Sequence, residues 1–227
     1  MLGTIVNALS ILAGTAIGLV LKNGLFEKMS DTLMKGLGLC TMYIGITGAL
    51  RGENTLILIL SVIIGTVIGE AVDLDARLRN LGDAIQSRFS KDESGEVSLA
   101  EGFVTASLLF CVGAMAIVGS LQSGLEGNHM VIYNKSVLDF VAAIIYASTL
   151  GIGVGLSAVA VFLYQGAIVV LASYLAPFLT DGAVNEMCCV GSVILIGLAM
   201  NMIGITKLKV MNYVPAIFVP ILLCMFM

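Results

Sequence analysis

Charged residues are scarce in this sequence and absent from most of its length. They make up 11% of the chain, whereas hydrophobic residues make up 59% and the mean hydropathy is +1.06. Soluble domains carry roughly 25% charged and about 45–50% apolar residues. A chain with so few charges cannot cover its apolar surface in water. The sequence therefore excludes a water-soluble enzyme and predicts an integral membrane protein.

Other absences remove further classes of function. His129 is the only histidine, which argues against a histidine–carboxylate metal cluster. The sequence has no phosphate-binding glycine loop and no Ser/His pair, and its basic residues between 77 and 91 are too scattered for a nucleic-acid surface. The five cysteines lie within apolar runs, where they act as small packing residues. We therefore expect no enzyme, cofactor, metal or nucleic-acid partner.

A secretory signal is not expected at the start of the chain. Met1-Leu2-Gly3 carries no basic side chain, and no small-x-small cleavage site leads into a hydrophilic domain. We expect the first apolar segment to remain as a membrane helix.

Charge-free runs define the expected helices. A helix rises 1.5 Å per residue and the hydrocarbon core is about 30 Å thick, so roughly 20 apolar residues span it. The run 140–180 is about twice that length, which favours two helices joined by a tight turn. The sequence predicts an all-α, polytopic transmembrane helix bundle in one domain, residues 1–227. Eight spans are expected, at about 2–21, 33–51, 54–71, 102–122, 136–156, 159–177, 185–204 and 211–227.

The basic residues predict the orientation, because lysine and arginine are enriched in cytoplasmic loops. With eight spans and an external N-terminus, nine of the eleven basic residues are cytoplasmic, and only Arg51 and Lys135 are external. In a seven-span alternative, 159–177 enters the membrane and returns on the same side. Seven basic residues are then cytoplasmic and four are external. Both arrangements place the N-terminus on the external side of a cytoplasmic (inner) membrane. The eight-span arrangement fits the distribution of basic residues better.

One polar stretch has the pattern of a surface helix. Within 72–90, apolar residues recur at helical spacing while charged ones occupy the other faces. This predicts an amphipathic helix along the cytoplasmic interface.

Internal repeats are the most informative feature. Ser10–Gly18 matches Ser61–Gly69 at five of nine positions, at a constant offset of 51. A cysteine followed by a glycine eight residues later recurs at Cys40, Cys111 and Cys189. These matches predict repeat-like units at about 1–50, 54–122 and 136–204. Glycines four apart allow close helix approach in lipid, so the expected helix-packing residues are Gly14, Gly18, Gly65, Gly69, Gly151 and Gly155.

Polar side chains within the spans are few, and each is a candidate for lining a solute path. Amides can instead join helices by hydrogen bonds, and Glu70 and Asp139 are expected close enough to an interface to reach water. The glycine-interrupted helix 102–122 is typical of helices that line a cavity, although close packing explains it equally well. We expect Asn7, Ser120 and Asn201 to face a common cavity between the units. The candidates are Asn7, Glu70, Ser120, Asp139 and Asn201.

The repeated Ser-x-x-x-Gly-Thr-x-x-Gly segments and the segment Phe110–Ser120 carry a family resemblance. There the sequence resembles the YqgA/YdfK-like bacterial membrane proteins, domain of unknown function 554. The resemblance covers nearly the whole chain, including the opening Gly3-Thr4-Ile5-Val6-Asn7. It implies a bacterial multi-pass membrane protein, and it supplies neither a substrate nor functional residues.

Two classes of function remain. Repeats, glycine-dense helices and the lack of a nucleotide-binding motif favour a small secondary transporter or channel-like carrier, with the lipid bilayer and an unidentified small solute as partners. The alternative is a non-transporting scaffold, sensor or partner subunit. A polar cavity near the midplane favours transport, whereas a solid apolar bundle favours the scaffold. Assembly into a homo-oligomer stays open.

Overall fold

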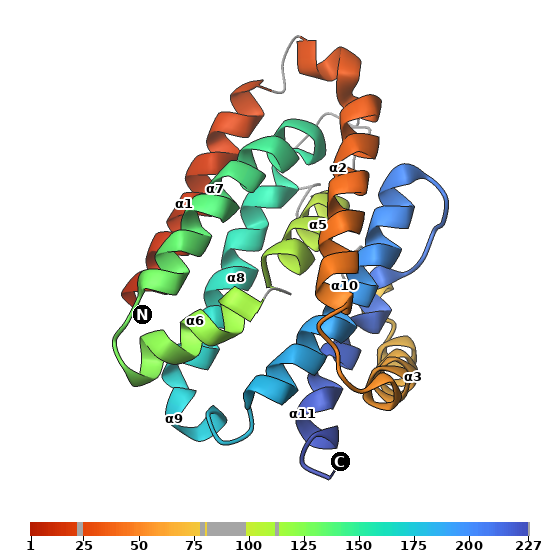
Figure 1. Cartoon of the computed structure of the whole chain (residues 1–227). Coiled ribbons are helices and arrows are strands. Elements are labelled where there is room, and N and C mark those ends of the chain that lie inside the picture. Colours follow the sequence, from red (N-terminus) through yellow and green to blue (C-terminus); the bar gives the residue numbers. More distant parts are fainter. Residues whose placement is uncertain (22–24, 78–79, 81–98, 112–113, 227) are drawn as a thin grey trace.

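The computed structural model describes residues 1–21, 25–77, 80, 99–111 and 114–226, and these residues form helices without a strand (Figure 1). This confirms the all-α class. The helices are α1 (Leu2–Leu21), α2 (Leu25–Ala49), α3 (Thr55–Val72), α5 (Leu99–Cys111), α6 (Ala114–Leu125), α7 (Met130–Leu150), α8 (Gly153–Val170), α9 (Ala172–Leu175), α10 (Asp181–Ile203), the 3₁₀ helix η1 (Val210–Phe218) and α11 (Val219–Leu223).

Five of the described helices are long and apolar enough to cross a membrane, namely α1, α3, α7, α8 and α10. The pair α5 and α6, inclined to each other by 62°, makes a sixth if both belong to one broken span. These helices confirm a multi-pass membrane protein, with five or six clear spans. The expected eight also require α2, which begins in a charged segment, and the short pair η1 and α11.

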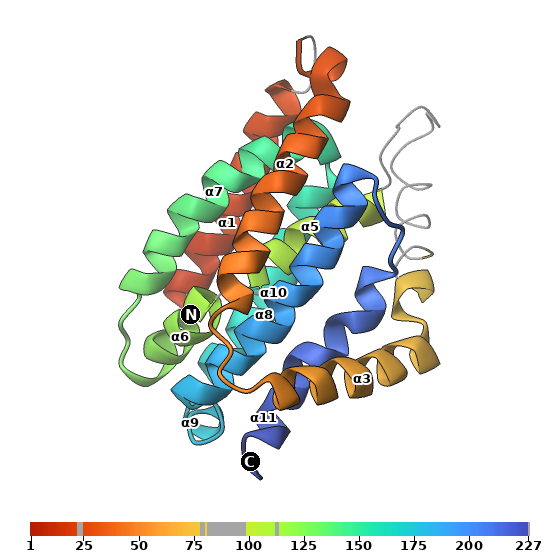
Figure 2. The same cartoon turned by 45° about the vertical axis from the view of Figure 1, so that its right-hand side comes forward.

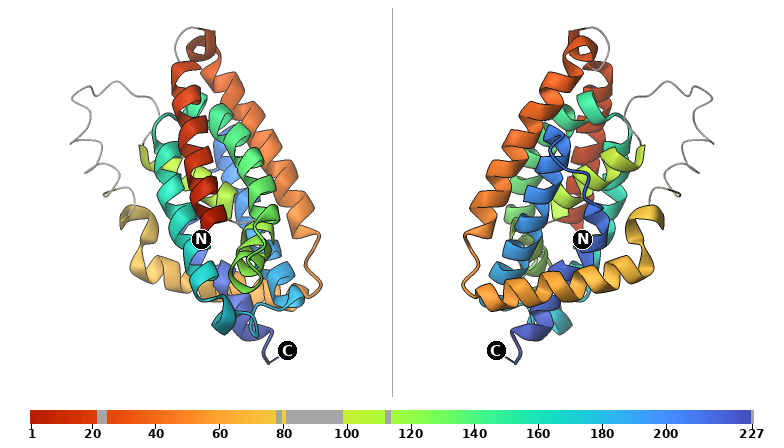
Figure 3. Two further views of the ribbon diagram at one scale, coloured as in Figure 1. Left: turned by 90° about the vertical axis from the view of Figure 1, so that its left-hand side faces the viewer. Right: turned by 90° about the vertical axis from the view of Figure 1, so that its right-hand side faces the viewer.

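The helices form two groups with a shorter pair between them. α1, α7 and α8 pack together, α2 packs along α10, and α5 and α6 lie between the groups (Figures 1 and 2). α3 lies across the lower end of the bundle, where it packs on η1 (Figure 3).

Small and polar residues of α1 face the protein, whereas its large apolar residues other than the buried Ile11 mostly face outward. Gly3, Asn7 and Gly14 are buried, and Leu9 and Leu12 are exposed. This pattern suits lipid, where helices associate through close backbone contact and large apolar side chains face the acyl chains.

Glycines set the contact between α1 and α7. A Cβ atom at Gly14 would overlap the carbonyl oxygen of Phe140, and one at Gly18 would overlap that of Ile144. Both residue numbers rise together along the contact, so the two helices run parallel.

The same kind of contact joins α3 to η1. A Cβ at Gly65 would overlap the backbone of Ala216, and one at Gly69 would overlap the carbonyl oxygen of Asn212. Along this contact the residue numbers of α3 rise as those of η1 fall, so the two helices are antiparallel.

The run 140–180 forms two helices, but its turn comes earlier than expected. α7 ends at Leu150 and α8 begins at Gly153, so the predicted bounds 136–156 and 159–177 are about six residues late. Gly151 adopts φ 74° and ψ −156°, a conformation nearly restricted to glycine. Gly151 therefore forms the turn rather than a helix-packing face. Gly155 packs near Thr15, where an added Cβ would lie 3.2 Å from the threonine Cγ2.

One sequence prediction falls largely outside the described residues. It is the amphipathic helix 72–90, of which only 72–77 and 80 are described.

Candidate functional site

Four buried side chains from three helices form one polar cluster. It consists of Asn7 on α1, Lys135 and Asp139 on α7, and Gln165 on α8. Asn7 Nδ2 donates to Asp139 Oδ2 at 3.0 Å and to Gln165 Oε1 at 3.4 Å. The Lys135 ammonium donates to the same Asp139 oxygen as an ion pair. The exposed fractions are 0% for Asn7 and Gln165, 5% for Lys135 and 6% for Asp139.

The buried polar cluster lies well inside the helices. Asn7 is five residues from the start of α1, or about 8 Å along its axis, and Asp139 is nine residues, or about 14 Å, from the start of α7. α8 runs back after the turn, and Gln165 is five residues before its end. The three helices thus bring these side chains to a similar depth.

Some polar atoms of the cluster have no protein partner. Asn7 Oδ1 and Gln165 Nε2 are fully buried and unpaired. A buried polar group without a hydrogen bond is costly, so these atoms are available to water, to a rearranged cluster or to a ligand. The Lys135 ammonium also lies 5.8 Å from the centre of the Phe110 ring, within the range of a cation–π interaction.

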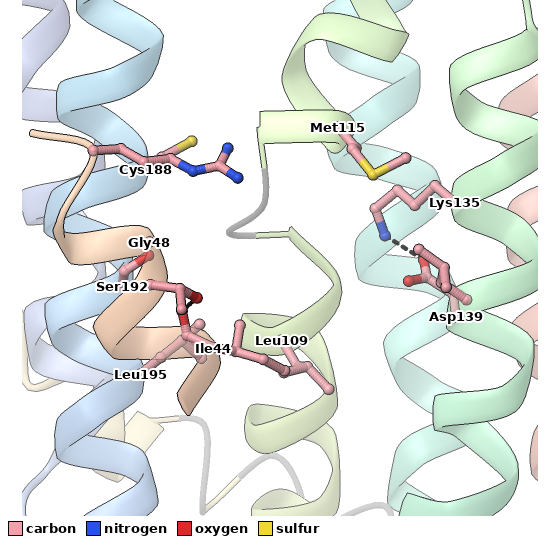
Figure 4. Close-up of a pocket in the computed structure, with 12 residues that line it drawn as sticks. Ile44, Gly48, Leu109, Met115, Lys135, Asp139, Cys188, Ser192 and Leu195 are labelled. Atoms are coloured by element: carbon pink, nitrogen blue, oxygen red, sulfur yellow. Dashed lines mark hydrogen bonds and ion pairs between the residues drawn. The ribbon is translucent and has the colours of Figure 1, made fainter. Parts of the chain in front are cut away.

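A pocket of about 250 Å³ lies beside the ion pair (Figure 4). A cavity needs only about 10–15 Å³ by this measure to hold one water molecule, so a small solute fits. Lys135 and Asp139 stand on one side of the pocket, and Cys188 and Ser192 stand on the other. The lining residues are Ile44, Thr47, Gly48, Arg51, Leu109, Met115, Lys135, Leu138, Asp139, Cys188, Ser192 and Leu195.

The structure brings together two of the predicted site residues, Asn7 and Asp139. The expectation that Asp139 lies near the outer end of its helix is wrong, because α7 begins at Met130 and places Asp139 at mid-helix. Lys135, expected in an external loop, lies inside the same helix. Its burial is tolerated because Asp139, four residues on, lies on the same helix face.

The other two members of the expected common cavity lie elsewhere. Ser120 donates to the carbonyl of Ala116 in its own helix at 2.6 Å. Asn201 holds the turn after α10, where its side chain bonds the backbone N–H and carbonyl of Leu208 at 2.9 and 2.8 Å. Asn7, Ser120 and Asn201 do not line the pocket, so the expectation of one cavity shared by these three is wrong for this pocket.

Glu70 belongs to a separate polar group at the junction of α3 and η1. It accepts a hydrogen bond from Asn212 and lies 3.5 Å from the Lys209 ammonium. Hydrogen bonding from Asn212, followed by the charge of Lys209, lowers the pKa of the neighbouring Asp73 below its usual value. Glu70 therefore helps to hold α3 against η1 and does not line the pocket.

The family model described as "Protein of unknown function (DUF554)" matches residues 2–225. The chain belongs to the DUF554 family. The assignment confirms the resemblance seen in the sequence.

Two relatives match this DUF554 protein along nearly their whole length. "Uncharacterized membrane protein YdfK" of Bacillus subtilis (strain 168) is 31% identical over 224 residues, which cover 97% of this chain and 94% of the relative. "Uncharacterized protein YqgA" of Escherichia coli (strain K12) is 27% identical over 218 residues, which cover 95% of this chain and 93% of the relative. No solved structure matches the chain.

Several buried or pocket-lining residues of this DUF554 protein were missed as site candidates. Lys135 could have been found from its i, i+4 spacing to Asp139. Gln165 is a single amide within the charge-free run 140–180, but its pairing with Asn7 and the position of Arg51 at the pocket arise from tertiary packing, for which there is no local signal. Glu186, 4% exposed, accepts from the backbone N–H groups of residues 53 and 54 at 2.7 and 2.8 Å and so fixes the turn before α3.

Within the described part of this DUF554 chain, no three His, Cys, Asp or Glu side chains lie close enough together to hold a metal ion. What the pocket offers instead is a charged pair, an arginine and two hydroxyl groups around a small, partly apolar space, and the amides of Asn7 and Gln165 contact the buried polar cluster outside the pocket lining.

Proposed function

We propose that this DUF554 protein is a small secondary transporter or channel-like carrier, and that its solute binds beside Lys135 and Asp139. The observation that carries the proposal is the Lys135–Asp139 ion pair, which is buried among the helices and also lines the pocket. The proposal assigns transport across the bilayer rather than catalysis, and it needs no cofactor.

A buried ion pair is an expensive way to hold helices together. The effective cost of removing each ion from water is several kcal/mol, and apolar residues of similar volume often serve stability equally well. Ionisable residues within transmembrane helices therefore point to solute or proton pathways by default. The place of this pair in the pocket wall supports such a role.

The inclination of α5 to α6 supports the same site. Leu109 near the end of α5 and Met115 near the start of α6 both line the pocket, and the two helices are inclined by 62°. Transporters form substrate sites at discontinuous helices, because irregular backbone in a membrane is tolerated where it lines a cavity.

We further propose eight crossings, with the N-terminus outside a bacterial cytoplasmic membrane. The antiparallel contact of α2 with α10 supports this count. Gly38 lies against Met202, and Gly52 lies against Cys189. With eight crossings α2 is the second and α10 the seventh, which makes them antiparallel. With seven crossings α10 would be the sixth and would run parallel to α2.

Solute entry into liposomes tests the transport function. Purified protein is reconstituted, and stopped-flow light scattering follows osmotic swelling with glycerol, choline chloride or sodium lactate outside. At least one solute should enter faster than in protein-free liposomes. The double variant K135M/D139L, which removes both charges without leaving one unpaired, should lower that rate to the protein-free level.

Matched controls separate the site from general charge effects. K207M and D181N change the same residue types at exposed positions and should retain the rate. If folded wild-type protein admits none of these solutes, or if K135M/D139L keeps the full rate, the transport role is wrong. The scaffold, sensor or subunit role would then be favoured.

A further inference from the structure

We infer that the pocket binds a small organic monoanion with a short apolar group, and that Asp139 takes up a proton as the anion binds. The inference rests on the proposed function, because it names the class of solute and the coupling ion for the same pocket. It predicts that one anion and one proton cross together.

The charged side chains of the pocket favour an anion. Arg51 and Lys135 are cationic and Asp139 is anionic, so the lining carries one net positive charge. An ammonium group has three N–H donors, and Lys135 directs one to Asp139. The hydroxyl group of Ser192 adds a donor on α10, whereas the Thr47 hydroxyl donates to backbone carbonyls within α2.

The rest of the wall favours an apolar group on that anion. Burial of a short hydrocarbon chain against aliphatic side chains is favourable, whereas an inorganic anion makes no use of them. The volume of about 250 Å³ limits the ligand to a small molecule. The apolar side chains of the lining are Ile44, Leu109, Met115, Leu138 and Leu195.

Charge balance introduces the proton. The charge that must balance is that of the buried groups, because Arg51 is exposed and water screens its charge. Without a ligand the buried Lys135–Asp139 pair is neutral, and an anion bound to it would place a net negative charge among buried groups, which is costly. If a proton from the aqueous phase bonds to an Asp139 carboxylate oxygen, the Lys135–Asp139 ion pair is replaced by a Lys135–anion pair. The loaded cluster is then neutral as well. Release of the anion and the proton on the other side restores the original pair.

Asn7 can serve Asp139 in both protonation states. Its Nδ2 donates to the Asp139 carboxylate at 3.0 Å. Its Oδ1 is fully buried without a protein partner, and a half-turn of the amide would direct this oxygen to Asp139, where it can accept the O–H of the protonated carboxyl group. An amide offers both a donor and an acceptor, which a lysine or arginine at this position would not.

Among the described residues, few other titratable groups face the ion pair. α1 presents Asn7 and α8 presents Gln165, neither of which titrates. α5 places Cys111 close enough to interact electrostatically with both members of the pair. The turn after α2 brings Arg51, and α10 brings Cys188, to the pocket lining. Among these groups Asp139 is the carboxylate, and it is the group to which we assign the proton.

Thermal stabilisation of the purified protein tests the inference, with sodium lactate as the probe. Lactamide, the neutral amide with the same carbon skeleton, and sodium chloride are the matched controls. Lactate should raise the Tm and the controls should not. The apparent Kd for lactate should fall about tenfold for each unit by which pH is lowered, because one proton binds with each anion.

Two variants test the assigned residues. D139N imitates the protonated carboxyl group and should bind lactate with an affinity independent of pH. Its unpaired Lys135 should gain more stability from lactate than the wild type gains. R51Q, a change at an exposed residue that leaves no buried charge unpaired, should weaken lactate binding about tenfold. D181N should bind as the wild type does.

Equal stabilisation by lactamide, lactate binding to the wild type that is independent of pH, or unchanged affinity in R51Q would each overturn the inference. Entry of glycerol into liposomes without lactate binding would overturn this inference alone. Lactate binding with the expected pH dependence but without entry of any solute would support the anion site and overturn the transport function.

Discussion

At the scale of single residues, Lys135 and Asp139 differ from the rest of the buried polar cluster in how they meet. Residues four apart on a helix are neighbours on one face, so α7 alone brings this pair together. Asn7 and Gln165 join only when α1 and α8 pack against α7. The ion pair is therefore local, whereas its hydrogen-bonded surroundings depend on the tertiary fold.

A comparison of single and double variants follows from this burial. K135M or D139N alone should lower the stability by about 3–5 kcal/mol, because each leaves a buried polar group without its partner. K135M/D139L should lie close to the wild type. Thermal unfolding in detergent can be followed with a thiol-reactive dye, since Cys188 and Cys189 are buried.

The control for that comparison is D181N, whose side chain is exposed. If the double variant is as unstable as the worse single variant, the ion pair stabilises the fold. The argument for a functional pair would then lose its physical basis.

These residues also explain why sequence reasoning found only part of the site. A prediction that places helix ends at charged residues excludes Lys135 from its helix, although its partner Asp139 is four residues away. Asn7 and Asp139 were recognised because isolated polar residues stand out in apolar segments. Their pairing with each other and with Gln165 spans 132 and 158 residues, and no local pattern encodes it.

At the scale of helices, glycine contacts hold the elements together. α3 meets η1 at Gly65 and Gly69, where the facing backbone leaves no room for a side chain. Such contacts depend on backbone approach rather than on hydrophobic burial, which has little driving force in lipid.

A pair of glycine-to-alanine changes tests these contacts. G69A should lower the thermal stability, because its Cβ would overlap the carbonyl oxygen of Asn212. G36A is the matched control within a helix, since nothing lies within 4 Å of the added atom. It should leave stability unchanged or raise it by about 0.5–1 kcal/mol, because alanine favours helix more than glycine does.

Equal Tm values for G69A and G36A in detergent would show that close approach at Gly69 does not matter.

The existence of most helices could be predicted from charge-free runs, but their ends could not. α2 begins at Leu25 rather than near 33, and α7 at Met130 rather than near 136. Helical hydrogen bonding continues past the last apolar residue, so hydropathy locates the membrane segment better than the helix.

At the scale of the whole molecule, the direction of each helix determines which loops share a side. Cysteine labelling tests the proposed eight crossings in a variant without the five native cysteines. Asn128→Cys, in the loop before α7, should react with an impermeant thiol reagent from outside. Lys207→Cys, in the loop after α10, should react only from inside. Both positions are exposed.

External labelling at both positions would support seven crossings. Reversed labelling would overturn the orientation. A labelled membrane-embedded position, such as Val159→Cys on the exposed face of α8, serves as the negative control.

The parallel contact between α1 and α7 has a consequence for synthesis of the chain. Asn7 enters the membrane long before Asp139 exists, since 132 residues separate them. At about 5–20 residues per second, this amounts to roughly 7–26 s of translation. During that time the first helix crosses the bilayer without its permanent partner, and its glycine face and amide remain open to lipid or to the insertion machinery. The first helix to be made is therefore among the last to be packed, and a ribosome that stalls before α7 leaves an unfinished membrane protein for quality control to recognise.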